Sequence, residues 1–101
     1  MAHEMLVGLE VIDDLEYQAY RKAMTPLLKS YGGSFSYDFK VAEVLISETS
    51  EPINRVFTIN FKNVESMKAF FSDEKYLAIK DKHFKNSVTH NTLIASYQKN
   101  I

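Results

Sequence analysis

The spacing of the apolar residues changes along this chain, and this change limits its fold more than any other feature. In residues 5–12 the apolar side chains alternate loosely with a period of two, which is typical of a strand. In residues 14–31 they recur every three or four residues, which predicts an amphipathic helix. Two strand-like segments, a second helical stretch and a final strand follow. The predicted order is strand, helix, strand, strand, helix, strand.

Capping residues mark the ends of the first helix. Asp13 stands at the N-cap position, and Glu16 lies three residues later, where it completes a capping box. Gly32 and Gly33 supply the left-handed stop, with Gly33 expected at positive φ, and Pro26 is expected to kink the helix.

The middle of the chain predicts a hairpin. Residues 34–47 form a long extended segment whose apolar side chains change phase, which indicates a bulge or bend near residues 40–43. Residues 48–54 carry Pro52 and read as a turn, and residues 55–61 form the returning strand.

The second half closes with helix and strand. Asn63 is placed to cap a helix that runs through Phe71, and Ser72 or Asp73 to cap a further helical segment. Residues 89–97 form the last strand.

This order predicts one α+β domain over residues 1–101, with the ferredoxin-like βαββαβ fold: a four-stranded antiparallel sheet with both helices on one face. Several strands carry apolar side chains in both phases, so the helix-free face would expose a large apolar patch. A second copy of the chain is expected to cover that patch, which predicts a homodimer.

Composition excludes several functional classes. Hydrophobic residues make up 46% of the chain and its formal net charge is -1, which offers no basic field for nucleic acid or for a membrane surface. RNA-recognition domains share this strand order, but residues 54–61 lack their basic, glycine and aromatic core. The chain has no Cys for a disulfide or thiolate site and no long apolar run, so a cytoplasmic protein is expected.

Four short motifs resemble the domain of unknown function 1330 family. They are Tyr17-x-x-Tyr20-Arg21, Leu28-x-x-Tyr31-Gly32-Gly33, Arg55-Val56-x-x-x-x-Phe61 and Phe71-Ser72-x-x-x-Tyr76-x-x-x-Lys80, and the likeness runs from about Leu6 to Tyr97. The resemblance implies a dimeric α/β barrel, in which two sheets pair, related to the antibiotic-biosynthesis monooxygenases. It does not imply their chemistry.

The chain also departs from the family pattern. Ser34 and Asp38 stand where the family usually has arginines, His83 replaces another arginine, and Asn60 replaces a glutamate. These departures argue against an anionic ligand held by paired arginines.

His83 is the candidate catalytic residue, because imidazole exchanges protons near neutral pH and the helical period groups His83 with Tyr76 and Lys80. A surface or partly buried structural histidine is the alternative. His90 lies on the last strand, where packing and ligand binding are equally open. No compact His and carboxylate motif accompanies them, so neither a metal nor another cofactor is expected.

A pocket between sheet and helices is the predicted ligand site, although aromatic side chains at such spacing also build ordinary cores. Arg21 is predicted to hold a ligand carboxylate, or instead to pair with Glu16 or Glu10. The predicted ligand-binding residues are Tyr20, Arg21, Tyr37, Phe57, Phe70, Tyr76 and His90.

Two functions follow from these observations. The first is a small-molecule binder or cofactor-independent enzyme that takes an aromatic or oxygenated metabolite. The second is a homodimeric metabolite-binding or structural module without catalysis.

Overall fold

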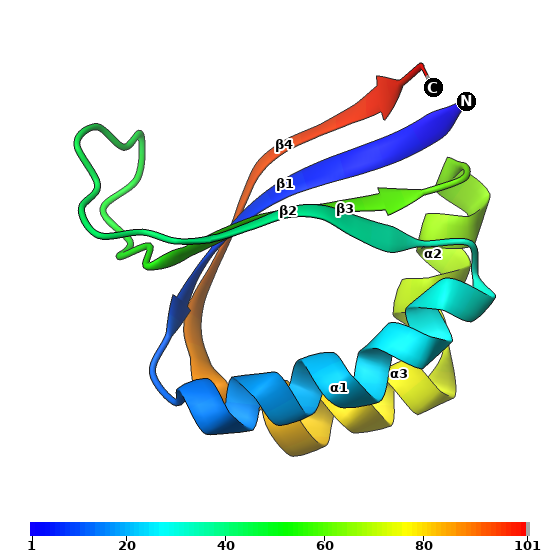
Figure 1. Ribbon diagram of the computed structural model, residues 1–101, viewed down its shortest axis with the longest axis horizontal. Coiled ribbons are helices and arrows are strands. Elements are labelled where there is room, and N and C mark those ends of the chain that lie inside the picture. Colours follow the sequence, from blue (N-terminus) through cyan, green and yellow to red (C-terminus); the bar gives the residue numbers. More distant parts are fainter. Residues whose placement is uncertain (101) are drawn as a thin grey trace.

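One antiparallel sheet with strand order β2-β3-β1-β4 carries all the helices on a single face (Figure 1). A computed structural model describes residues 1–100. The strands are β1 (Ala2–Val11), β2 (Ser34–Lys40), β3 (Arg55–Phe61) and β4 (Val88–Lys99). The helices are α1 (Asp14–Ser30), α2 (Val64–Ser72), α3 (Glu74–Ile79), a π-helical turn η1 (Lys80–Phe84) and the short α4 (Lys85–Ser87). The predicted ferredoxin-like order and class are confirmed.

Side-chain caps begin the helices where the sequence places them. The carboxylate of Asp13 accepts a hydrogen bond from the backbone N–H of Glu16 at 3.1 Å. Asn63 caps α2 through Ser66 and Asp73 caps α3 through Lys75, each at 2.7 Å. The carboxylate of Glu16 does not close the predicted capping box, because it binds the imidazole Nδ1 of His83.

The core lies between α1 and the concave face of the sheet. Alternate residues of the two central strands, among them Leu9 and Phe61, face α1, whose Tyr17 and Leu28 are fully buried. α2 and α3 add Phe70 and Tyr76 to the same core. This packing gives the helices and the sheet one shared apolar interior.

The predicted strand over residues 34–47 is wrong in its second half. β2 ends at Lys40, and residues 41–54 form a long arm that projects from the sheet (Figure 1). A backbone hydrogen bond of 2.9 Å from Val41 to Asn54 closes the base of the arm. Beyond that bond residues 42–53 belong to no strand, and the arm's Leu45 and Ile46 are exposed.

The phase change in β2 also lies earlier than predicted. The register shift falls between Phe35 and Tyr37, which pair with Ile59 and Thr58 of β3. Phe35 therefore faces the helices, whereas Tyr37 lies on the opposite, outer face of the sheet.

The helix stop differs from its prediction by one residue. Gly32 has the left-handed backbone conformation, with φ of 75°, whereas Gly33 does not have a positive φ. Gly33 is needed for space, because a Cβ there would lie 2.9 Å from the Leu28 Cγ.

The outer face of the sheet carries exposed apolar side chains. Tyr37 and Phe39 are 60% and 55% exposed, and Ile94 and Tyr97 on β4 are 48% and 39% exposed.

No helix among residues 1–100 is long and apolar enough to cross a membrane.

Candidate functional site

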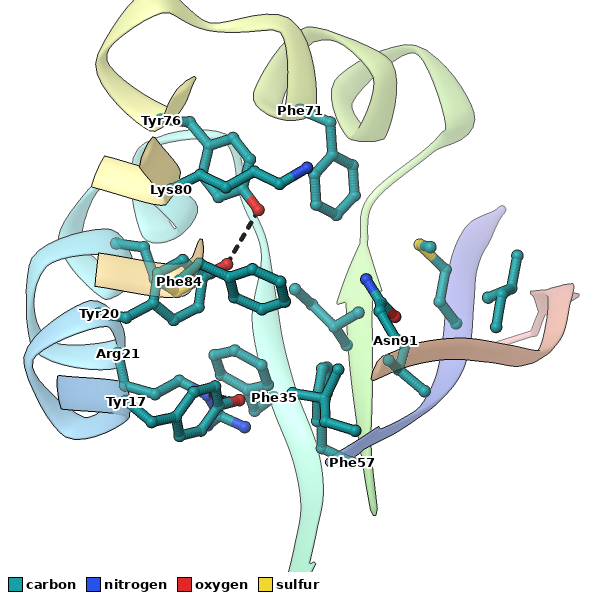
Figure 2. A pocket seen from close by; sticks show the side chains of 16 residues that line it. Tyr17, Tyr20, Arg21, Phe35, Phe57, Phe71, Tyr76, Lys80, Phe84 and Asn91 are labelled. Carbon is teal, nitrogen blue, oxygen red and sulfur yellow. Dashed lines mark hydrogen bonds between the residues drawn. The ribbon is translucent and has the colours of Figure 1, made fainter. Parts of the chain in front are cut away.

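A cavity of about 320 Å³ lies between the helices and the concave face of the sheet (Figure 2). Its helical wall consists of Tyr17, Tyr20, Arg21, Met24, Phe71, Tyr76, Lys80 and Phe84. Its sheet wall consists of Met5, Val7, Leu9, Phe35, Phe57, Ile59, Asn91 and Leu93. Side chains alternate in direction along each strand, so every other one points toward the helices and contributes to the sheet wall.

The two tyrosine hydroxyls at the centre of the helical wall form a pair. The hydroxyl oxygens of Tyr20 and Tyr76 lie 2.9 Å apart, and either one can donate (Figure 2). Burial raises the pKa of both phenols above its usual value, and the neighbouring Tyr76 raises that of Tyr20 further. Both groups stay protonated at neutral pH. Since one proton is shared within the pair, the other hydroxyl hydrogen is free to meet a ligand.

Arg21 is held in place on three sides. Its Nε donates to the Tyr17 hydroxyl at 2.8 Å, and its Nη1 lies 3.3 Å from the Asp38 carboxylate. The guanidinium carbon lies 3.9 Å from the Phe35 ring centroid, which is cation–π distance. Its Nη2 is buried and has no hydrogen-bond partner within the described residues.

Asp38 joins Arg21 to a second arginine. Arg55 donates two hydrogen bonds to Asp38, from Nε at 2.7 Å and from Nη2 at 2.8 Å. These bonds hold the pKa of the Asp38 carboxyl below its usual value, with a smaller contribution from Arg21. Two guanidinium groups thus share one carboxylate, and the cluster keeps one positive charge.

This arrangement excludes both ion pairs that the sequence offered for Arg21. Neither Glu16 nor Glu10 is its partner: Glu16 binds His83, and Glu10 accepts hydrogen bonds from Thr89 and His90. Asp38, from β2, takes that place.

The structure brings together four of the predicted site residues. Tyr20, Arg21, Phe57 and Tyr76 line the cavity from α1, β3 and α3.

The other four predicted residues lie elsewhere. His83 binds Glu16 from the π-helical turn, and its side chain is not part of the cavity wall. Phe70 is fully buried in an aromatic cluster, 4.6 Å between centroids from Tyr76. Tyr37 stacks on Phe39 on the outer face, where His90 binds Glu10 from β4. Their functional roles stay predictions.

Sequence reasoning missed two polar lining residues, Lys80 and Asn91. Lys80 follows Tyr76 by one helical turn, and that spacing was the signal for it. The strand pattern did not indicate Asn91, because the pairing of β1 with β4 shifts register between Glu10 and Val11. As a result Asn91 lies opposite Leu9 and His90 lies opposite Glu10.

Among residues 1–100, no group of three His, Asp or Glu side chains is arranged to hold a metal ion.

Residues 5–97 match the family described as Domain of unknown function (DUF1330). No curated protein matches the chain in sequence.

Solved structures with the same fold come from several bacteria. A protein of unknown function from Rhodopseudomonas palustris is 20% identical with a TM-score of 0.80, over 99% of this chain and 83% of that one. A dimeric protein of unknown function from Bacteroides fragilis is 12% identical with a TM-score of 0.62, over 97% and 96% of the two chains. A Nitrosomonas europaea protein provisionally named an antibiotic biosynthesis monooxygenase is 15% identical with a TM-score of 0.67, over 97% and 89%. At these identities the likeness shows the fold alone.

Proposed function

The chain belongs to the DUF1330 family, and on that premise we propose that it is a homodimeric α/β barrel protein that binds a small aromatic or oxygenated metabolite. The ligand site is the cavity between sheet and helices. The amino-acid composition of the chain, which has no cysteine, supports a cytoplasmic location.

The observation that carries this proposal is the make-up of the cavity. Its volume of about 320 Å³ lies at the lower end of the ~300–1,000 Å³ typical of small-molecule sites. Its walls are largely aromatic and aliphatic, and a few fixed polar groups converge on it, chiefly Arg21 and the Tyr20–Tyr76 pair. A mainly apolar site with a few placed polar groups is the usual form of a metabolite site.

Binding is favoured over proton-transfer catalysis by the titratable groups of the lining. These are three tyrosines, one arginine and one lysine, with no carboxylate or imidazole among the described lining residues. A general base works best with a pKa near the working pH, and burial moves the pKa of Tyr20 and Tyr76 away from it.

A cofactor-independent enzyme is the second candidate. The hydroxyl pair and Arg21 place donors on one wall, and such donors stabilise negative charge that develops on a bound substrate. That arrangement serves a reaction in which the substrate itself is the reactive species.

The homodimer is supported by the outer face of the sheet. Tyr37 and Phe39 on one edge strand and Ile94 and Tyr97 on the other are each at least 39% exposed there, and soluble monomers seldom leave large apolar areas uncovered. The Bacteroides fragilis relative with this fold is itself dimeric.

A thermal-shift screen of aromatic and oxygenated metabolites tests the cavity, with hits confirmed by NMR. Leu93 lines the cavity and is 54% exposed, so Leu93→Trp is expected to fill its mouth and to weaken every hit by at least about tenfold. Leu77→Trp is the matched control, because Leu77 is 47% exposed but lies outside the lining. Hits that bind both variants alike, or no hit at all, would reject the proposal.

A further inference from the structure

The cavity is polar on one wall and apolar on the other. Its helical wall carries the hydroxyls of Tyr20 and Tyr76, the guanidinium of Arg21 and the ammonium of Lys80 (Figure 2). The sheet wall is apolar except for Asn91. A ligand that fits both walls has an apolar face and one polar edge.

The polar wall offers donors almost exclusively. Guanidinium and ammonium groups have no acceptor, and the protonated hydroxyl pair has one hydrogen to give. Arg21 and Lys80 are both cationic, and no acidic side chain lines the cavity within residues 1–100. The matching ligand edge accepts hydrogen bonds and carries negative charge.

Arg21 supplies the fixed point of that wall. Tyr17, Asp38 and the Phe35 ring hold its guanidinium in one orientation, yet the buried Nη2 has no partner among the described residues. A buried donor without a partner is costly, and a charged acceptor relieves that cost with a stronger bond than a neutral one.

The local charge leaves room for an anion. Arg21 shares the single Asp38 carboxylate with Arg55, which donates two hydrogen bonds to it, so the two guanidinium groups keep one positive charge. Lys80 adds a second positive charge at the same wall and forms no ion pair within residues 1–100.

We propose that the cavity takes an aromatic monocarboxylate, whose carboxylate meets Arg21 and whose ring packs on the apolar sheet wall. This inference rests on the proposed function and narrows its ligand class. It also differs from binding by paired arginines, because Arg21 lines the cavity whereas Arg55, which also binds Asp38, does not.

The test compares acids with neutral isosteres of the same shape. Benzoate, cinnamate and indole-3-acetate are titrated against the protein by NMR, each beside its primary amide. Each acid that fits is expected to bind about tenfold more tightly than its amide, as one charged hydrogen bond predicts. Arg21→Gln is expected to remove this preference and leave the affinity for the amide nearly unchanged.

Two further variants keep the test independent of folding. Lys80→Gln removes the second cation from a partly exposed helical position and is expected to reduce the preference by a smaller factor. Lys22→Gln makes the same charge change at an exposed position next to Arg21 and is expected to have no effect.

The outcomes separate the two ideas. If amides bind as tightly as acids, the ligand is not a carboxylate. If the preference for acids survives in both Arg21→Gln and Lys80→Gln, these two cations do not bind the carboxylate. In either case only this inference fails. If no probe perturbs the NMR signals of Phe35 and Phe57, and the metabolite screen also gives no cavity binder, the proposed function fails with it.

Discussion

The hydroxyl groups of Tyr20 and Tyr76 meet at 2.9 Å and join α1 to α3 across 56 residues of sequence. The pair lies at the wall of the cavity, so one contact supports both the packing of the two helices and the shape of the site. Each of the two residues is 5% exposed, so each hydroxyl has the other as its main partner.

This pair predicts strong coupling between two substitutions. Tyr20→Phe or Tyr76→Phe alone leaves a buried hydroxyl without its partner and is expected to lower the free energy of unfolding by about 1–3 kcal/mol. The double variant is expected to cost less than the sum by at least ~0.5 kcal/mol, measured by urea denaturation. Tyr20→Phe with Tyr97→Phe is the control, because Tyr97 lies on the outer face and should add independently.

The Asp38 cluster predicts a pH dependence of stability. Hydrogen bonds from Arg55 lower the pKa of Asp38, so the ionised carboxylate stabilises the fold above the unfolded pKa of ~3.9, and this contribution is lost as pH falls through the lower folded pKa. Asp38→Asn is expected to cost about 1 kcal/mol at pH 7, less than a fully buried pair because solvent screens it.

The difference between parent and Asp38→Asn is expected to shrink below pH ~4, as followed by urea denaturation across pH. Asp81→Asn is the control, since its ion pair with Lys85 is exposed and should contribute little at any pH. A difference that stays constant down to pH 2, or grows on acidification, would contradict the assignment.

The two glycines after α1 are expected to resist substitution for different reasons. A Cβ at Gly33 would meet the fully buried Leu28 and lie 3.1 Å from the backbone oxygen of Asn60, so Gly33→Ala is expected to cost about 1–3 kcal/mol by overpacking. Gly32→Ala is expected to cost about 1–2 kcal/mol through its positive φ.

Thermal unfolding of two further variants distinguishes the positive φ of Gly32 from the lack of space at Gly33. Gly32→Asn should be milder than Gly32→Ala, because asparagine tolerates the left-handed region. Gly33→Ala should be partly rescued by Leu28→Ala, which removes the clash. An additive Gly33→Ala and Leu28→Ala pair would show that space is not the cause.

The outer face predicts the oligomeric state. Sedimentation at micromolar concentration is expected to give about twice the chain mass of 11.7 kDa. A charge placed at the patch, as in Phe39→Asp, is expected to dissociate the dimer. Leu15→Asp is the matched control, since Leu15 is 80% exposed on α1 at the opposite side of the sheet. A parent protein that sediments as a monomer would reject the homodimer.

Local signals predicted most of the fold. Asp13, Asn63 and Asp73 each act on a backbone N–H two or three residues away, so the neighbouring sequence contains the whole interaction. The end of β2 is different, because pairing with β3 decides it. Apolar residues continue past Lys40 and predicted a longer strand, yet no partner strand lies beside them.

The site was predictable where it follows the local period of one helix or one strand, as at Tyr20 on α1 and Phe57 on β3. Tyr20 and Arg21 were found in this way, whereas Glu16 was expected to cap its own helix and instead binds His83, 67 residues away. Register shifts in β2 and β4 moved Tyr37 and His90 to the outer face and brought Asn91 to the cavity. A bulge depends on the facing strand, which the pattern of one strand does not contain.

The central position of β1 affects how the chain reaches this structure. β1 is made before β4, yet its longest pairing is with β4, and Glu4 meets Tyr97 across 93 residues. Such distant pairing is slow to form, because a large loop must close before the contacts repay its entropy. While the ribosome is still adding β4, one edge of β1 has no neighbour and is open to strands of other nascent chains. The last strand of the fold therefore protects the first one from aggregation.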